Sequence, residues 1–176
     1  AMTRIAFLLS IALLAACSAG AGAPPESAAP PPPGHVAPLP ASDPSQPAWP
    51  GEVTNVLSRS DAQRLLANKG ASLQWIDWNT RGQAVVTPGQ ALWTLRAAQT
   101  APDRKGRMIL DGAILEVGEG YFTFRGTIRI ADTPDAGRMC EATKTWHFAV
   151  TQNRKYYRLR EFEWCDGLTD YIDIYF

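Results

Sequence analysis

The residues best suited to covalent chemistry in this sequence are three cysteines, and their positions separate them into two kinds. Cys140 and Cys165 lie in the C-terminal third, whereas Cys17 closes an apolar run near the N-terminus. A β-hairpin turning at Gln152-Asn153 sets Cys140 opposite Cys165, and opposed positions bring Cβ atoms to about 4.5–5.5 Å, near the range of a disulfide. We therefore predict a Cys140–Cys165 disulfide in an oxidising compartment. A metal site is disfavoured because further ligands of the usual type are lacking nearby.

The same hairpin register predicts the neighbours of His147, the single histidine of the C-terminal domain. It pairs Trp146 with Leu159 and sets His147 opposite Arg158. A histidine acting as a general base needs a carboxylate to orient it and a nucleophile to activate. The sequence contains neither a G-x-S-x-G nor an H-E-x-x-H motif. We therefore interpret His147 as a strand residue on a polar face and predict no catalytic residues.

Acidic residues near the C-terminus suggest a second kind of chemistry. Asp166 and Asp170 flank a turn, and their carboxylate oxygens are of the type that binds Ca²⁺. The segment lacks the twelve-residue spacing of an EF-hand, so we expect carboxylates that are solvated or hydrogen-bonded within the turn. Two carboxyl groups facing one cleft about 5–9 Å apart would instead indicate a hydrolase.

Aromatic residues are numerous for a domain of this size, and most of them must fill its core. Trp78 and Trp164 are exceptions, because each lies at the end of a predicted strand beside polar residues. An aromatic ring beside arginines makes a recognition patch. We therefore predict a candidate binding surface of Trp78, Trp164, Arg158, Arg160 and His147.

The first 17 residues read as an export signal. Arg4 precedes an apolar run over residues 5–14, which is too short to span a membrane but suits a signal peptide. The string Leu14-Ala15-Ala16-Cys17 resembles the lipobox of bacterial lipoproteins. This resemblance implies removal of residues 1–16 and a lipid on Cys17, which would hold the protein on a membrane. Ser18, in place of an aspartate, implies the periplasmic face of the outer membrane over the outer face of the inner membrane.

Composition divides the rest of the chain in two. Most of the fourteen prolines lie within residues 17–50, where they exclude helix and sheet and predict a disordered Pro/Ala-rich tether. Residues 51–176 have the length of one domain. Zero formal net charge disfavours a nucleic-acid binder, and no cofactor is predicted.

Hydrophobic periodicity predicts the architecture of residues 51–176. Residues 60–70 form a helix with Ser60 as its cap and Gly70 at its end. A period of two then predicts successive strands joined by tight turns. These strands cover residues 71–78, 83–87, 91–98, 107–117, 122–130 and a final hairpin. We expect a mainly β (α+β) domain, an antiparallel meander of seven or eight strands forming a small barrel or sandwich, with the short N-terminal helix packed on it.

Three functions fit these features. The first is a non-catalytic module that binds another envelope component or a small apolar ligand. The second is an inhibitor or immunity protein of a cell-wall hydrolase, acting through a protruding loop at 102–107 or 132–138. The third is a hydrolase using acidic residues such as Asp166 and Asp170. The oligomeric state and the ligand are left open.

Overall fold

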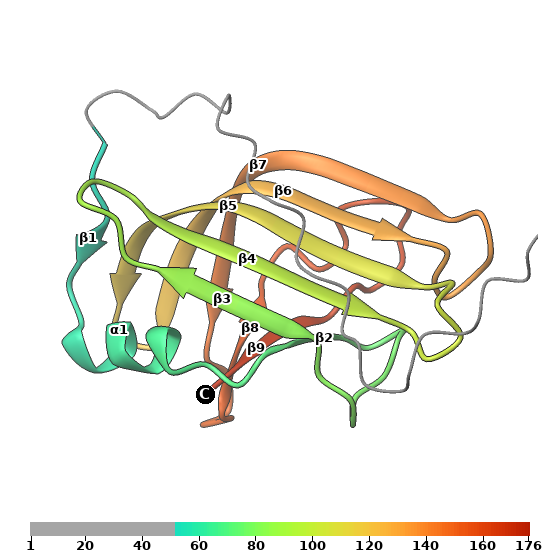
Figure 1. Ribbon diagram of the computed structural model, residues 1–176, viewed down its shortest axis with the longest axis horizontal. Helices are drawn as coiled ribbons and strands as arrows, with labels where there is room; N and C mark the ends of the chain where they lie inside the picture. The colour runs from blue at the N-terminus through green and yellow to red at the C-terminus, as the bar shows by residue number, and fades with distance from the viewer. Residues whose placement is uncertain (1–51) are drawn as a thin grey trace, which may run out of the picture. The chain divides into compact units, whose positions relative to one another are not determined.

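Alternating inward and outward side chains organise the residues that this computed structural model describes, 52–176. They form a mainly β domain, a nearly closed antiparallel barrel with one short helix (Figure 1). Within them, no helix is long and apolar enough to cross a bilayer. The predicted signal peptide, Cys17 and the tether lie outside the described residues. The elements are β1 (Asn55–Val56), α1 (Arg59–Leu66), β2 (Ala71–Leu73), β3 (Gln83–Thr87), β4 (Trp93–Thr100), β5 (Arg107–Gly118), β6 (Tyr121–Ala131), β7 (Met139–Ala149), β8 (Tyr156–Leu159) and β9 (Ile172–Tyr175).

The sheet is a meander from β3 to β9, as the sequence predicts, with β2 added beyond β9. The two end strands, β2 and β3, approach each other through a single antiparallel bridge between Ala71 and Gly82, so the barrel is almost closed. β1, which the periodicity does not reveal, pairs in parallel with β5. Of the two predicted architectures, barrel and sandwich, the chain adopts the barrel.

The barrel interior is filled by aromatic and aliphatic side chains from β4 to β9. Phe122 and Phe148 stack at 4.8 Å between ring centroids, and Tyr157 meets Phe122 edge to face. The indole of Trp146 is fully buried and donates to the carbonyl of Gly126 at 2.9 Å, which satisfies its polar atom. The interior is therefore a packed core.

One end of the barrel is covered by α1, which differs at both of its ends from the predicted helix over 60–70. Its cap is Ser58, whose hydroxyl accepts from the backbone N–H of Asp61 at 3.3 Å, and the helix ends at Leu66. Ser60 lies inside the helix. The buried Asp61 carboxylate also accepts from the Tyr157 hydroxyl at 2.6 Å, which joins helix and core.

The predicted strand over 71–78 is wrong beyond Leu73. The chain turns there because the buried Gln99 side chain hydrogen-bonds backbone groups that would otherwise pair with a neighbouring strand. Its carbonyl accepts from the Leu73 N–H at 2.6 Å, and its amide donates to the carbonyls of Asp77 and Thr80. The β2–β3 connection, residues 74–82, is therefore an ordered loop that carries Trp75 and Trp78.

The predicted register of the last hairpin is wrong by two residues. Leu159 pairs with Phe148 instead of Trp146, and Arg158 pairs with Ala149 instead of His147. The turn at Gln152-Asn153 is in place, with both residues at positive φ. The strands separate next to it because the N–H of residue 150 donates to the Gly120 carbonyl and the carbonyl of residue 155 accepts from Phe176.

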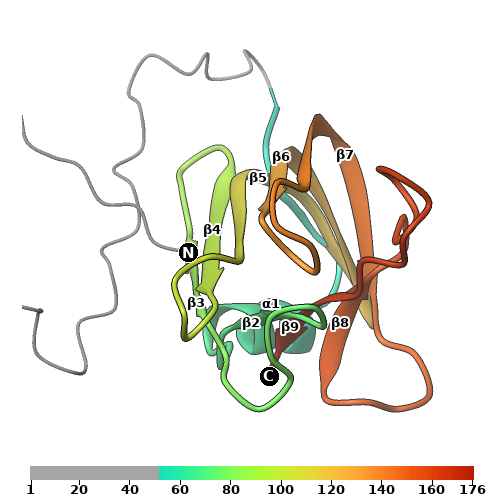
Figure 2. The ribbon, with the colours of Figure 1, turned by 90° about the vertical axis from the view of Figure 1, so that its right-hand side faces the viewer.

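The chain after β8 nevertheless returns along β7, and a disulfide joins Cys140 and Cys165 with their Cα atoms 5.9 Å apart. The pairing of the cysteines matches the prediction, although the segment that carries Cys165 is a loop instead of a paired strand. The β2–β3, β4–β5 and β6–β7 connections meet at the end of the barrel opposite α1 (Figure 2). The disulfide lies toward this end, because Cys140 is the second residue of β7 and follows the β6–β7 connection.

Candidate binding cleft at the loop end of the barrel

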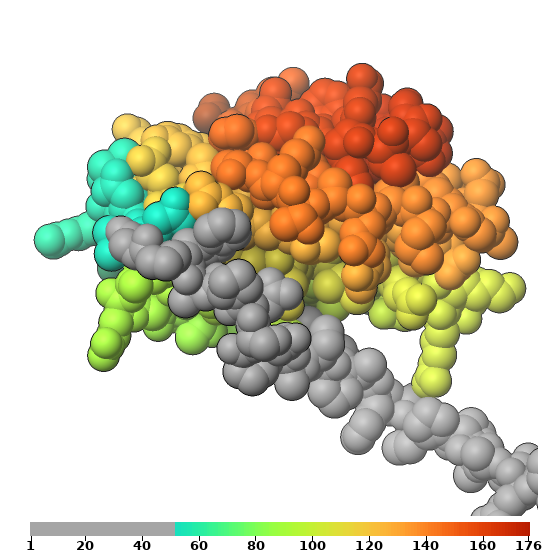
Figure 3. All heavy atoms as spheres, turned by 90° about the horizontal axis from the view of Figure 1, so that it is seen from above, coloured from blue at the N-terminus to red at the C-terminus, as the bar shows by residue number. Residues whose placement is uncertain are grey.

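Three connections far apart in the sequence enclose an open cleft at this end, which we call the loop-end cleft. Trp75 and Ile76 come from the β2–β3 connection, Ala101–Arg107 from the β4–β5 loop, and Asp132–Pro134 with Ala136 from the β6–β7 loop. The β4–β5 loop projects beside the β6–β7 loop in a space-filling view (Figure 3). The cleft measures about 800 Å³, a size typical of ligand sites in proteins.

The β4–β5 loop is a tight turn with a fixed shape. The N–H of Ala101 donates to the Gly106 carbonyl at 2.7 Å, and Arg104, at a φ of 62°, donates to the Ala101 carbonyl at 2.8 Å. Gly106 lies so close to Thr133 that an added Cβ would come within 2.9 Å of the Thr133 Cβ. The absence of a side chain at Gly106 therefore lets the two loops pack against each other.

The β6–β7 loop is held by bonds within itself and to the floor of the cleft. The N–H of Asp132 donates to the Arg138 carbonyl, and the N–H of Gly137 donates to the Asp132 carboxylate. The Thr133 hydroxyl donates to the carbonyl of Trp75 at 2.9 Å. Two walls of the cleft are thus joined directly, and the site is shaped before any ligand arrives.

Behind the cleft, Arg138 binds the two carboxylates that the sequence singled out. Its guanidinium donates to both oxygens of Asp166 at 2.7 and 2.8 Å and to both oxygens of the fully buried Asp170 at 3.0 and 2.9 Å. Asp170 also accepts from the Trp75 indole at 3.0 Å. The Arg138 guanidinium holds the pKa of the Asp166 carboxyl far below its usual range. Both carboxylates therefore serve an ion-pair clamp, an arrangement unlike an open acid–base pair.

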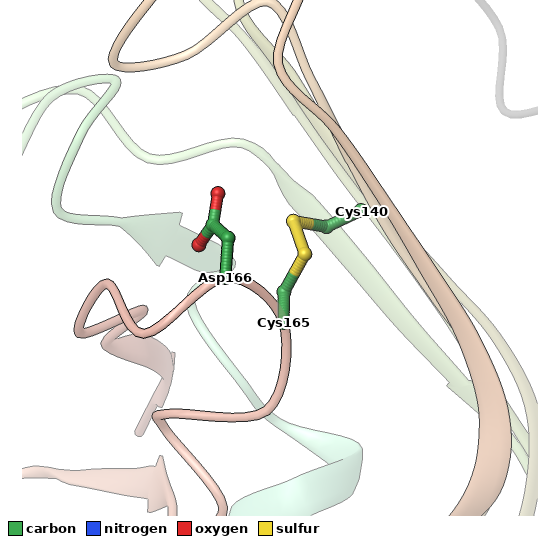
Figure 4. Close-up of side chains that lie close together, drawn as sticks. All are labelled: Cys140, Cys165 and Asp166. Atoms are coloured by element: carbon green, nitrogen blue, oxygen red, sulfur yellow. A yellow bond between two sulfur atoms is a disulfide. The ribbon is translucent and has the colours of Figure 1, made fainter.

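The disulfide lies next to this clamp, with Asp166 directly after Cys165 (Figure 4). The sulfur atoms and an Asp166 oxygen lie within 4.8 Å of one another, a grouping that could suit a metal. In the disulfide, however, neither sulfur is a thiolate, and Asp166 is already bound to Arg138. The grouping is therefore a covalent and ionic clamp on the 160–171 segment.

The charges around the loop-end cleft are mostly positive. Arg104, Lys105 and Arg107 are all exposed, and within residues 52–176 none of them forms an ion pair. The two carboxylates of the lining are held in their own turns, Asp103 by the N–H of Lys105 at 3.1 Å and Asp132 by the N–H of Gly137 at 2.9 Å. Three cations against two carboxylates leave the lining with a formal net charge of +1.

The predicted binding surface is divided by the fold. Trp78 and Arg158 do lie together, with the guanidinium carbon 5.6 Å from the Trp78 ring centroid. Arg158 is buried, though, and makes two bonds of 2.8 Å to the carboxylate of the fully buried Asp173. It also packs over the Tyr171 ring at 4.1 Å. This arginine stabilises the outer face of β8 and β9, and of the two residues Trp78, 45 % exposed, is the accessible one.

The other three predicted residues lie along β7 and the chain after β8. The His147 ring bonds the Glu161 carboxylate at 2.5 Å, and Arg160 donates its backbone N–H to the His147 carbonyl. Trp164 packs edge to face on Trp146 at 5.2 Å, and its buried indole N–H has no acceptor among the described residues. These side chains do not line the loop-end cleft.

The residues that do line the cleft were only partly visible in the sequence. The loops at 102–107 and 132–138 were predicted as candidates for contact with a hydrolase, but separately. Trp75 was assigned to a strand, although a run of Asp77, Trp78, Asn79 and Thr80 so close behind it is typical of a turn. This run predicts a turn, and a turn at that position places Trp75 near the end of the barrel.

These features define a class, a small antiparallel β-barrel with a preformed, positively charged cleft at one end. The chain belongs to the PM1083 family, whose model matches residues 53–176. It is 31 % identical over 115 residues to an uncharacterised protein, PM1083, of Pasteurella multocida (strain Pm70). The match covers 64 % of this chain and 74 % of that relative. No solved structure matches the chain.

Proposed function

We propose that this protein is a lipid-anchored binding module of the bacterial envelope, and that it recognises another envelope component through the loop-end cleft. The single observation that carries the proposal is the cleft itself, about 800 Å³ in volume and enclosed by three interlocked connections. Because the walls of the cleft are held by internal bonds, the loops lose little conformational entropy when a ligand binds. The lining supplies apolar surface and charge, which are what a recognition site needs.

The chemistry of the lining supports binding over catalysis. The single hydroxyl side chain among the lining residues, that of Thr133, donates its hydrogen to the Trp75 carbonyl. A serine- or threonine-type nucleophile would instead be hydrogen-bonded to a general base. Asp166 and Asp170, the acidic pair considered for a hydrolase, lie behind the cleft and share the Arg138 guanidinium.

The envelope address is supported by the lipobox at residues 14–17 and by the disulfide, which forms in oxidising compartments. A proline-rich tether would let the barrel reach away from the periplasmic face of the outer membrane. Labelling cells with radioactive palmitate tests the anchor. We expect label in the wild type and none in Cys17→Ala, while an equally labelled variant would contradict the anchor.

The binding function is tested by filling the cleft. Ala136 lines it and is exposed, so Ala136→Trp places an indole in the cleft without disturbing the core. Gln90→Trp adds the same ring to the exposed β3–β4 loop, outside the cleft. Each chain also carries Cys17→Ala, so that no lipid holds it on the membrane. We then expect the otherwise wild-type chain and Gln90→Trp to sediment with isolated envelopes, and Ala136→Trp to do so at least fivefold less. Equal sedimentation of all three proteins would exclude the cleft as the binding site.

A second candidate, an inhibitor of a cell-wall hydrolase, is supported by the meeting of its two predicted loops. The 102–107 and 132–138 loops lie together and are held rigid, as the contact loops of tight protein inhibitors are. Purified chain added to lytic enzymes acting on peptidoglycan tests this role. Inhibition that is lost on shortening the β4–β5 loop would favour it, and undisturbed lysis at micromolar chain would exclude it.

A further inference from the structure

We infer that the ligand of the loop-end cleft is an oligosaccharide bearing carboxylate groups. This inference rests on the proposed binding function and names the chemical class that the cleft recognises. Three features of the cleft support it: cations without ion pairs, a single tryptophan in the lining, and loop backbone groups that already hydrogen-bond within their own turns.

The cations determine the sign of the ligand. Arg104, Lys105 and Arg107 hold three of four consecutive positions along one rim, each exposed and without an ion pair within residues 52–176. Guanidinium groups bind carboxylates through paired N–H donors, a geometry that a compact ammonium ion cannot match. Asp103 and Asp132 each accept a backbone N–H of their own turn, and within residues 52–176 neither forms an ion pair with these cations.

Trp75 supplies the surface for a sugar ring. Its indole N–H is directed to Asp170, behind the cleft, and the side chain remains 36 % exposed among the lining residues. The face of an indole carries negative charge density, and the C–H bonds on one face of a pyranose carry partial positive charge. A sugar ring therefore packs on an indole held in place, and the bond to Asp170 holds this one.

The backbone of the cleft favours a saccharide over an extended peptide. A peptide needs N–H and C=O partners along its length, most often at a free strand edge. At this end β4 and β5 pair with each other up to Thr100 and Arg107, and the loops use backbone groups in their own turns. A saccharide presents hydroxyl and carboxylate groups, which the guanidinium groups of Arg104 and Arg107 can bind. The concave shape likewise disfavours the flat surface of a bilayer.

Calorimetric titration of the full-length chain tests the inference with three probes of similar length. The probes are hexagalacturonate, which is a carboxylated pyranose chain, neutral maltohexaose and a hexaglutamate peptide. We expect binding of hexagalacturonate that weakens at least tenfold from 50 to 300 mM NaCl, since the contacts are ionic. We expect binding of the other two to be at least tenfold weaker. Equal or tighter binding of maltohexaose would overturn the role of charge, and tighter binding of hexaglutamate would indicate an acidic protein segment.

Matched variants locate the binding. The double variant Arg104→Gln/Arg107→Gln removes two cations from the rim, and Arg59→Gln/Lys69→Gln removes two exposed cations at the α1 end. The first pair should weaken hexagalacturonate binding at least tenfold and the second less than twofold. Similar losses in both would reveal nonspecific attraction and overturn the inference.

Failure of the inference is distinguishable from failure of the proposed function. If none of the three probes binds while Ala136→Trp still abolishes sedimentation with envelopes, the cleft is a binding site for other chemistry and the saccharide is excluded. If Ala136→Trp sediments as the wild type does, the binding function of the cleft itself is excluded.

Discussion

The two ends of the barrel are stabilised by different physics. At the α1 end, a helix caps the core, and its buried Asp61 is bound by the Tyr157 hydroxyl and by Ser58. At the loop end, a disulfide and the Arg138 clamp connect irregular segments around an open cleft. Loops contribute little apolar burial, so a fixed shape there requires covalent and ionic connections. The loop end is thus held by covalent and polar contacts, and the α1 end by a helix packed on the core.

The largest effect expected from this comparison is at Arg138. Arg138→Met leaves the buried Asp170 carboxylate without its main partner, and an unpaired buried charge costs about 3–5 kcal/mol of unfolding free energy. The matched change Arg129→Met breaks an exposed ion pair with Glu141 and should leave the urea midpoint nearly unchanged. Equal midpoints for the two variants would show that the clamp does not stabilise the loop end.

The second largest effect is expected from the disulfide. Cys140→Ala/Cys165→Ala opens a loop with a sequence separation of 25, which costs about 3–4 kcal/mol by loop-closure entropy. Urea unfolding with and without reductant measures this. Reductant should lower the midpoint of the wild type to that of the double variant and leave the variant unaffected. A wild type insensitive to reductant, with the bridge shown to be open, would contradict the comparison.

The third effect belongs to the α1 end. Tyr157→Phe removes the donor to Asp61 and should cost about 1–3 kcal/mol near neutral pH, because a buried acceptor loses its partner. Burial alone would raise the pKa of the Asp61 carboxyl. Hydrogen bonds from Tyr157, Ser58, the backbone of Gly120 and Arg64 outweigh this and lower it.

The lowered pKa fixes the sign of the pH dependence at this end. A carboxyl whose pKa is depressed in the folded state stabilises the protein above its ordinary pKa of about 3.9, and this contribution is lost as pH falls through the folded-state value. The stability gap between wild type and Tyr157→Phe should therefore narrow from about pH 6 to about pH 3 in urea titrations. A stability gap that widens as the pH falls would contradict a lowered pKa of Asp61.

The sequence predicted the long strands of this fold better than its ends and loops. Along β6, buried side chains alternate with more exposed ones from Tyr121 to Ile130, a pattern that period-two analysis detects directly. The alternation in β5 is interrupted by a register shift between Ile114 and Glu116. The two-residue β1 has no period to detect. The strand predicted beyond Leu73 was wrong because the Gln99 side chain bonds the backbone there, and Gln99 is distant in sequence.

The candidate site was less predictable for the same reason. Alternation places Arg158 on the outward face of β8, and outward residues are expected in water. The β2–β3 connection and Tyr171 cover that face, so the arginine is buried with Asp173. Barrel closure likewise brings Trp75, the β4–β5 loop and the β6–β7 loop together, and no local pattern encodes that meeting.

The smallest effect sharpens the helix boundary at the α1 end. The sequence predicts Ser60 as the cap, and the structure assigns the role to Ser58, whose hydroxyl accepts from the Asp61 N–H and donates to the Asp61 carboxylate at 2.7 Å. Ser58→Ala should cost about 1 kcal/mol, the typical loss of a helix cap. Ser60→Ala removes an exposed 3.1 Å bond between the two serine hydroxyls and a 3.5 Å contact with the same carboxylate, and leaves the cap itself in place. It should cost less than half as much. If Ser60→Ala lowered the urea midpoint more than Ser58→Ala does, Ser60 would be the cap and the helix would begin two residues later.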